Sequence, residues 1–295
     1  MARCFCGWTP KMAETVTVYE VGPRDGLQNE PTPIATADKI ALVDMLSDCG
    51  VTAIEVTSFV SPKWVPQLAD AAEVMAGIAR RPAVRYAALT PNLKGFKAAK
   101  AAKADEVAVF ASASEGFSRA NINCSIDESL NRFAPVLAAA KTSLIPVRGY
   151  VSCVTDCPFD GPVTPAAVAR VARALYAMGC TRISLGDTLG RATPETADAM
   201  LAAVLADLPA AALSGHFHDT DGQALANIEI ALARGLRTFD AAVGGLGGCP
   251  YAPGAAGNVA TEAVVALLHR LGHPTGIDTD RLEQAARFAR TLRTG

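Results

Sequence analysis

Residues 182–218 read RISLGDTLGRATPETADAMLAAVLADLPAAALSGHFH, and this stretch decides the fold. Its two ends, 182–186 and 213–218, are short runs with the length and composition of buried β-strands. Between them, an alanine-rich segment opens with Thr193 and Pro194, a pair typical of a helix start. A strand, a helix and a second strand in this order predict a parallel pair, because a parallel connection requires a crossover.

The same alternation runs along most of the chain. A helical pattern follows each strand-like run, for example from Ala37 to a stop at Gly50, and again from Thr164. Eight such units in roughly 250 residues predict a (β/α)8 TIM barrel. A doubly wound sheet is the alternative, but no glycine-rich dinucleotide fingerprint follows the first strand. The expected strands are 16–21, 52–57, 84–89, 106–110, 147–152, 182–186, 213–218 and 238–243.

The barrel is predicted to be a single catalytic domain that spans residues 14–295. Residues 1–13 are predicted to be an N-terminal extension outside it. Near the other end, the segment RLEQAARFARTLR predicts an extra C-terminal helix that packs against the outside of the barrel. No linker or low-complexity segment divides the region between them.

Composition narrows the possible functions. The chain has 27 Lys and Arg against 29 Asp and Glu, so its net charge of −2 predicts no nucleic-acid or anionic-lipid partner. No apolar run reaches the ~20 residues that span a bilayer, and no signal-peptide pattern opens the sequence. The eight cysteines are widely spaced, which favours reduced thiols over a disulfide framework. These features predict a cytoplasmic protein with a small-molecule substrate.

Polar residues collect after the expected strands, where TIM barrels carry their active sites. His216 and His218 share one face of a strand, because side chains at i and i+2 point the same way. Two imidazoles at a strand end predict a metal site, with a hydrogen-bonded core pair as the alternative. Nearby carboxylate and amide oxygens favour Mg2+ or Mn2+, while zinc and cobalt stay open.

Further candidates lie within or just after other expected strands. Arg24 and Asp25 lie between two glycines, and such a pair suits a metal ligand beside a cation that stabilises an oxyanion. A turn with a surface ion pair is the alternative. Glu55 and Asp187 lie within or just after strands, where burial of an uncompensated acid is costly. We expect them to hold Arg24, a histidine or the metal rather than to transfer protons.

Residues 244–258 read GGLGGCPYAPGAAGN, and so many glycines cost backbone entropy. Cys249 in such a turn beyond a strand end predicts a mobile lid that delivers an acid or base, with an inert thiol as the alternative. A phosphate-binding loop would normally add Lys-Ser/Thr, which is missing here. Asn258 is predicted at the start of the last barrel helix, as a metal ligand or as its N-cap.

From residue 16 to residue 272, the sequence resembles the 3-hydroxy-3-methylglutaryl-CoA lyase family. The Gly-Leu-Gly-Gly-Cys-Pro-Tyr segment is specific to that family. The Arg-Asp-Gly and His-x-His features are shared with a wider set of metal-dependent TIM barrels that includes isopropylmalate and homocitrate synthases. The segments that carry the resemblance are GPRDGLQNE (22–30), IEVTSFVSPKWVPQ (54–67), LTPNLKGF (89–96), NINCSIDES (121–129), VRGYVSC (147–153), ISLGDTLG (183–190), HFHDTDGQALAN (216–227) and GGLGGCPYAPGAAGN (244–258).

The resemblance implies a role for each candidate. Arg24 would contact the substrate carbonyl and stabilise an enolate, and Cys249 would be the active-site thiol on the lid. Glu55 and Asp187 would belong to the supporting polar shell. The cofactor would be one divalent cation, Mg2+ or Mn2+, with the ligands Asp25, His216, His218 and Asn258.

The implied reaction is cleavage of 3-hydroxy-3-methylglutaryl-CoA to acetyl-CoA and acetoacetate, a step of leucine degradation and ketone-body chemistry. A condensing acyl-CoA transferase and a non-catalytic acyl-CoA-binding barrel are the alternatives. The expected partners are an acyl-CoA substrate and further copies of the chain in a homo-oligomer. Lys63, Lys94 and Arg119 follow strands and are candidate contacts for CoA phosphates. Asp221 and Gly244 depart from the family, which has tyrosine and alanine at these positions.

Overall fold

The computed structural model describes residues 14–248 and 257–293. Its main sheet is a closed barrel of eight parallel strands, in the order β1-β10-β9-β8-β5-β4-β3-β2. This arrangement confirms the predicted TIM barrel, and each expected strand is present with bounds shifted by at most a few residues. The strands are β1 (Thr17–Glu20), β2 (Ala53–Ser58), β3 (Arg85–Leu89), β4 (Glu106–Ser112), β5 (Val147–Ser152), β8 (Arg182–Asp187), β9 (Leu213–Phe217) and β10 (Thr238–Ala241).

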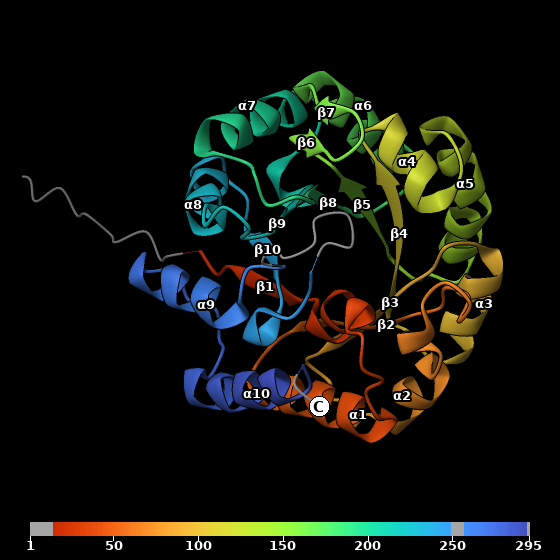
Figure 1. Cartoon of the computed structure of the whole chain (residues 1–295), viewed down its shortest axis with the longest axis vertical. Coiled ribbons are helices and arrows are strands. Elements are labelled where there is room, and N and C mark those ends of the chain that lie inside the picture. The colour runs from red at the N-terminus through yellow and green to blue at the C-terminus, as the bar shows by residue number, and fades with distance from the viewer. Residues whose placement is uncertain (1–13, 249–256, 294–295) are drawn as a thin grey trace, which may run out of the picture.

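Helices form a ring around these strands (Figure 1). Local sequence explains where several of them begin: the hydroxyls of Thr164 and Thr193 cap α6 and α7, each just before a proline, and Ser125 forms a capping box with Glu128 in α5. The helices are α1 (Thr36–Asp48), α2 (Ala71–Gly77), α3 (Leu93–Ala101), α4 (Glu115–Ile122), α5 (Ile126–Thr142), α6 (Pro165–Ala177), α7 (Pro194–Leu205), α8 (Ala224–Ala233), α9 (Thr261–Arg270) and α10 (Thr279–Thr291).

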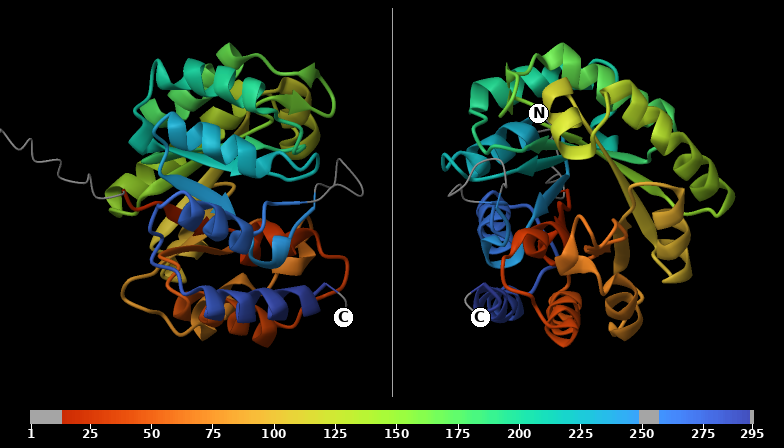
Figure 2. Two further views of the ribbon diagram at one scale, coloured as in Figure 1. Left: turned by 90° about the vertical axis from the view of Figure 1, so that its left-hand side faces the viewer. Right: turned by 45° about the vertical axis from the view of Figure 1, so that its right-hand side comes forward.

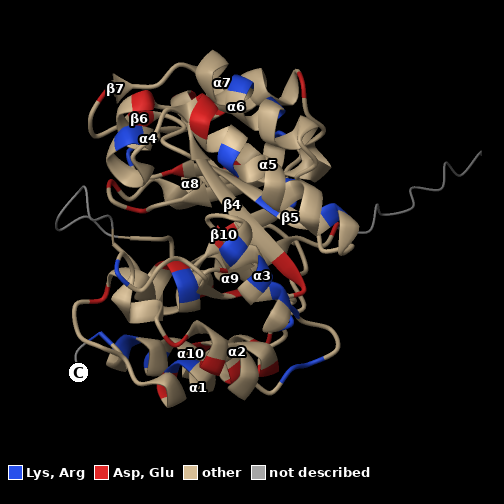
Figure 3. Cartoon of the chain, turned by 90° about the vertical axis from the view of Figure 1, so that its right-hand side faces the viewer, with Lys and Arg blue, Asp and Glu red and all other residues tan. Residues whose placement is uncertain are grey.

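The predicted extra C-terminal helix is α10, which packs against α1 and α9 on the outside of the ring (Figure 1, Figure 2). A short antiparallel hairpin, β6 (Asp156–Cys157) with β7 (Gly161–Pro162), follows β5 and was not expected from the sequence. Basic and acidic residues are interspersed along the outer helices (Figure 3). Among the described residues, no helix combines the length and the apolar character that crossing a bilayer requires.

Two layers of different chemistry lie on the two faces of the strands. Outward-facing side chains such as Val107 and Val109 of β4 are fully buried in the apolar layer beneath the helices. Inward-facing side chains are largely polar, because successive residues of a strand point to opposite faces. Buried polar and charged residues of this interior include Tyr19, Glu55, Glu106, Arg148, Tyr150, Ser184, His216 and Asp240.

Candidate active site

Arg24 and Asp25 lie at the carboxyl end of β1, on a single π-helical turn formed by Gly22–Gly26. Backbone crowding explains a glycine at the end of this turn. A Cβ atom added at Gly26 would lie 2.6 Å from the Cβ atom of Leu246, so a larger residue would push two segments of the site apart. The turn thus brings the Arg24-Asp25 pair against the segment that begins at residue 244.

The guanidinium of Arg24 is held between two acids. Its Nε atom donates to Oε2 of Glu55 at 2.5 Å, and one terminal nitrogen donates to Oδ1 of Asp25 at 2.5 Å. Burial opposes the charge of Arg24, but Glu55 and Asp25 outweigh it and raise the arginine's pKa above its usual value. The ring of Tyr150 lies 5.4 Å from the guanidinium carbon, and its hydroxyl donates to Oε2 of Glu55 at 3.2 Å. Arg24 is therefore a fixed, permanently charged group.

His216 lies near the end of β9, and His218 follows that strand, with ring centroids 5.3 Å apart. The Nε2 atom of His216 is 3.9 Å from Oδ2 of Asp25, so the strand end faces the β1 turn. On the other side of the ring, Nδ1 of His216 lies 3.2 Å from Oδ2 of Asp240, a buried acid of β10. Asp240 also accepts from the Ser184 hydroxyl at 2.7 Å and from the guanidinium of Arg148.

Asp25, His216 and His218 form a three-residue cluster whose ligand atoms all lie within 4.8 Å of one another. The cluster fits a divalent cation. Burial, together with the neighbouring His216, lowers the pKa of His218 to about 4, so its imidazole is neutral and keeps a lone pair at neutral pH. The Nδ1 atom of His218 is buried and has no hydrogen-bond partner among the described residues. Although burial opposes ionisation of Asp25, Arg24 and the histidines outweigh it and hold the carboxyl pKa well below its usual range.

Asn258 joins this cluster through its side-chain amide. Its Nδ2 atom donates to Oδ2 of Asp25 at 2.9 Å and to the carbonyl oxygen of Leu246 at 3.3 Å. Its backbone forms an isolated β-bridge with His218. The N-cap alternative is wrong: Ala260 is the N-cap of α9, and Asn258 lies before the helix, where the bridge aligns it with the strand end instead.

The remaining candidates are placed in different ways. Glu55 reaches Arg24, as described above. Asp187 accepts hydrogen bonds from the backbone nitrogens of Gly190, Arg191 and Ala192, so its carboxylate holds the loop that follows β8. Cys249 lies outside the described residues. Lys63, Lys94 and Arg119, the expected contacts for CoA phosphates, are exposed. The Nε atom of Arg119 lies 3.9 Å from Oε2 of Glu115.

Sequence reasoning missed two residues of the site. Asp240 stands in an expected strand, 238–243, and an acid at an inward position of a barrel strand is a signal that could have pointed to it. Tyr150 stands in the expected strand 147–152 and contacts both Arg24 and Glu55. A tyrosine in an apolar strand carries no such signal, because its ring is as compatible with a core as with a site.

Fold and cluster together define a class of protein: a TIM barrel with a candidate divalent-metal site at the carboxyl ends of its strands. Residues 15–289 match the family model described as HMGL-like, so the chain belongs to the HMGL-like family.

Individual relatives agree with this assignment. The chain is 58% identical over 275 residues to the mitochondrial hydroxymethylglutaryl-CoA lyase of Gallus gallus, covering 93% of this chain and 92% of that protein. It is 62% identical to the HMG-CoA lyase of Brucella melitensis, whose crystal structure it matches with a TM-score of 0.95 over 96% of this chain and all of the other. An HMG-CoA lyase from Acinetobacter baumannii, solved with coenzyme A and 3-methylmalate, is 40% identical with a TM-score of 0.90, covering 95% and 92%.

Proposed function

We propose that this protein cleaves 3-hydroxy-3-methylglutaryl-CoA to acetyl-CoA and acetoacetate. The single observation that carries the proposal is the convergence of Asp25, His216 and His218 on one point beside the fixed guanidinium of Arg24. This arrangement occurs in a chain that is 58% identical to a named lyase along nearly its whole length. Neither the condensing-transferase alternative nor a non-catalytic barrel has a comparable observation in its favour.

The metal proposal follows from the donor atoms. Asp25, His216, His218 and Asn258 would hold one Mg2+ or Mn2+ ion. Asn258 would bind the ion through its amide oxygen, which requires its amide group to turn over from the hydrogen bond that Nδ2 donates to Asp25. When bound, the cation would lower the cost of negative charge on the substrate's oxygen atoms. Zinc and cobalt are the alternatives that a binding measurement would separate.

Different side chains would transfer protons and stabilise negative charge during the reaction. Loss of the proton from the substrate's tertiary hydroxyl allows the adjacent C–C bond to break. This releases acetoacetate, and the electron pair of the broken bond stays with the other product, the enolate of acetyl-CoA. Arg24, held by Glu55 and Asp25, would offset the enolate's negative charge without having to reorient. Cys249 would then donate its proton to the enolate carbon, which completes acetyl-CoA. Asp25, or a group close to it, would take the first proton.

An acyl-CoA substrate is consistent with the Acinetobacter baumannii lyase, which was solved with coenzyme A. Lys63, Lys94 and Arg119 stay predictions as contacts for the CoA phosphates. A homo-oligomeric state and a cytoplasmic location likewise stay predictions.

Incubation with 3-hydroxy-3-methylglutaryl-CoA, with and without EDTA, tests the proposal when acetoacetate is measured. We expect acetoacetate only when a divalent cation is present, and its recovery when Mg2+ or Mn2+ is added back. Release of free CoA thiol from acetyl-CoA and a 2-oxo acid would instead identify the condensing transferase. Tight Mn2+ binding without any turnover would identify the non-catalytic barrel.

The role of Cys249 needs its own variant. Cys249→Ser should keep the affinity for Mn2+ and lose turnover, because only the proton donor changes. Equal losses of metal affinity and of turnover would show that the thiol has a structural role instead.

A further inference from the structure

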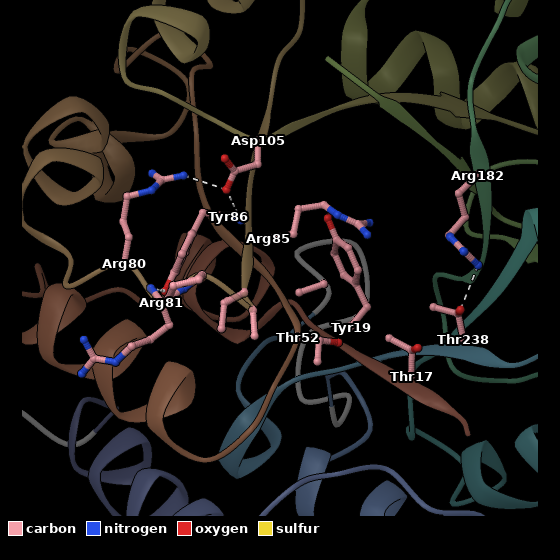
Figure 4. A pocket seen from close by; sticks show the side chains of 14 residues that line it. Thr17, Tyr19, Thr52, Arg80, Arg81, Arg85, Tyr86, Asp105, Arg182 and Thr238 are labelled. Atoms are coloured by element: carbon pink, nitrogen blue, oxygen red, sulfur yellow. Dashed lines mark hydrogen bonds and ion pairs between the residues drawn. The ribbon is translucent and has the colours of Figure 1, made fainter. Parts of the chain in front are cut away.

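A cavity lies at the opposite end of the barrel from the metal cluster. Its volume is about 670 Å³, within the range of small-molecule sites, and its lining includes residues at the amino-terminal ends of five strands (Figure 4). Those residues are Thr17, Ala53, Arg85, Arg182 and Thr238. The metal cluster lies at the carboxyl ends of the same barrel, so the two sites are separate.

Four arginines line this cavity, and three of them are paired with acids. Arg80 lies 2.7 Å from Asp105, and Arg81 lies 2.8 Å from Asp48, so each of these guanidinium groups has a carboxylate partner. Arg85 pairs at 3.0 Å with Oε2 of Glu106, while the other oxygen of that acid accepts from the hydroxyl of Tyr19 at 2.8 Å. Glu106 thereby accepts from both side chains, and its negative charge also acts on Arg182.

Arg182 is the fourth arginine, and no ion pair in the described part of the chain includes it. One terminal nitrogen donates to the hydroxyl of Thr238 at 2.8 Å and to the carbonyl oxygen of Leu213 at 3.4 Å. These are neutral acceptors, so they orient the guanidinium without balancing its charge. Burial, and after it the charge of Arg148, lowers the pKa of Arg182, although the charges of Glu106 and Asp240 oppose this shift.

Arg85 adds a second cation to the same side of the cavity. In Figure 4 its side chain extends from β3 toward the side on which Arg182 and Thr238 lie. The two guanidinium groups are close enough that the charge of Arg85 contributes to lowering the pKa of Arg182. Glu106 pairs with Arg85 and also acts on Arg182, so one carboxylate stands against two guanidinium groups. A further anion in the cavity would be attracted by both of them. The chain before residue 14 contains no Asp or Glu, so that segment has no acidic side chain to supply it.

We propose that this cavity binds a small phosphate monoester, with its phosphoryl group between Arg182 and Arg85. A phosphoryl group has three acceptor oxygens and two negative charges, which match two guanidinium forks better than the two oxygens of a carboxylate do. The hydroxyl groups of Thr17 and Thr52, which also line the cavity, are available to the organic part of the ester. This inference is independent of the proposed lyase activity, since none of these residues belongs to the metal cluster.

Calorimetric titration of the metal-loaded protein with inorganic phosphate and with glycerol phosphate tests the proposal, with malonate as the carboxylate probe at equal ionic strength. We expect both phosphates to bind, and glycerol phosphate to bind more tightly because it also fills the cavity beyond the phosphoryl group. Arg182→Gln should weaken binding about 10- to 100-fold, the loss expected for one charge-assisted contact. Arg85→Gln should weaken it as well, and since the Arg85 side chain is 49% exposed, this variant is the safer one for folding.

Arg81→Gln is the matched control, because Arg81 lines the same cavity but is directed at Asp48. It should leave phosphate affinity unchanged. The proposal is overturned if phosphate does not bind, or if Arg182→Gln and Arg85→Gln bind it as the unaltered protein does, which would place the phosphate at another site. Malonate affinity equal to that of phosphate would overturn the assignment of a phosphoryl group.

Discussion

Asp25 and Glu20 lie on the two sides of the barrel wall at the end of one strand, β1, and their carboxyl groups behave in opposite ways. Inside the barrel, Asp25 has a cation and two imidazoles nearby, which hold its pKa well below the usual range despite burial. Outside, Glu20 is buried beneath α9 and accepts from the backbone nitrogens of Gly22 and Val243 and from the hydroxyl of Thr261. Burial raises the pKa of Glu20 to about 7, because these donors only partly offset it and no ion pair within the described residues includes it.

The difference between Asp25 and Glu20 shows what keeps a buried carboxyl group ionised. Neutral hydrogen-bond donors are enough to place a buried carboxyl group, but not to keep it ionised. In the interior cluster, Asp25 stays ionised because it pairs with Arg24, and a second ion pair with Glu55 holds that arginine in place. The carboxylate ligand of a metal site must be ionised, so Arg24 serves both Asp25 and the proposed enolate.

Arg24→Met tests the interior half of this comparison and should have the largest effect. Turnover of 3-hydroxy-3-methylglutaryl-CoA should fall about 100- to 1,000-fold, because one preorganised charge donor is removed. Steady-state kinetics give the rate, and circular dichroism reports whether the variant is folded. Arg234→Met is the control, since Arg234 pairs with Asp198 on the helical surface. A folded Arg24→Met variant with near-native turnover would remove Arg24 from the mechanism.

Glu20→Gln tests the exterior half. The folded-state pKa of Glu20 is raised from 4.5 to about 7, so the folded protein binds this proton more tightly than the unfolded chain. Its contribution to stability is therefore complete below pH 4.5, falls as the pH rises toward 7, and then levels off. The total loss should be about 3 kcal/mol. Glutamine keeps an acceptor for the backbone nitrogens and does not titrate, so the variant should lack this loss.

Urea unfolding at several pH values, with the unaltered protein and the variant compared at each, measures that difference. Other titrating groups contribute equally to both proteins and cancel. If the two curves of unfolding free energy against pH run parallel through this range, Glu20 is ionised in the folded state and the comparison with Asp25 fails.

Asp240→Asn tests the contact between Asp240 and His216, which links the metal cluster to the barrel interior. Its effect should be smaller than those of Arg24→Met and Glu20→Gln. Asp240 is a positioning residue, because it touches Nδ1 of His216 rather than the substrate. Mn2+ affinity should fall about 10- to 100-fold, as for other partners of metal-ligating histidines. Titration with Mn2+ gives the affinity directly, without relying on activity.

Because Asp240 also pairs with buried Arg148, Ser184→Ala is a gentler companion variant: it removes only the hydroxyl that donates to Asp240 at 2.7 Å. A smaller loss of Mn2+ affinity in the same direction is expected. Unchanged affinity in a folded Asp240→Asn protein would show that His216 is held by its strand alone.

Much of the fold could be predicted because barrel strands and helices leave local signals. All eight expected strands and the C-terminal helix are present, since strand runs, helical spacing and Thr-Pro caps are written in neighbouring residues. The β6–β7 hairpin was missed because two-residue strands have no periodicity to detect. Asn258 was expected at a helix start, but its bridge to His218 depends on a segment distant in the sequence.

The sequence by itself determined the barrel and the residue types at its carboxyl end, because i and i+2 spacing and strand order are local properties. His216 and His218 could be assigned to one face without any coordinates. Only the tertiary structure decided which charges lie together: that Glu55 holds Arg24, that Asp240 holds His216, and that Arg182 donates to the Thr238 hydroxyl. Electrostatic energy depends on distance and burial, and strand closure sets both between residues that are far apart in the chain.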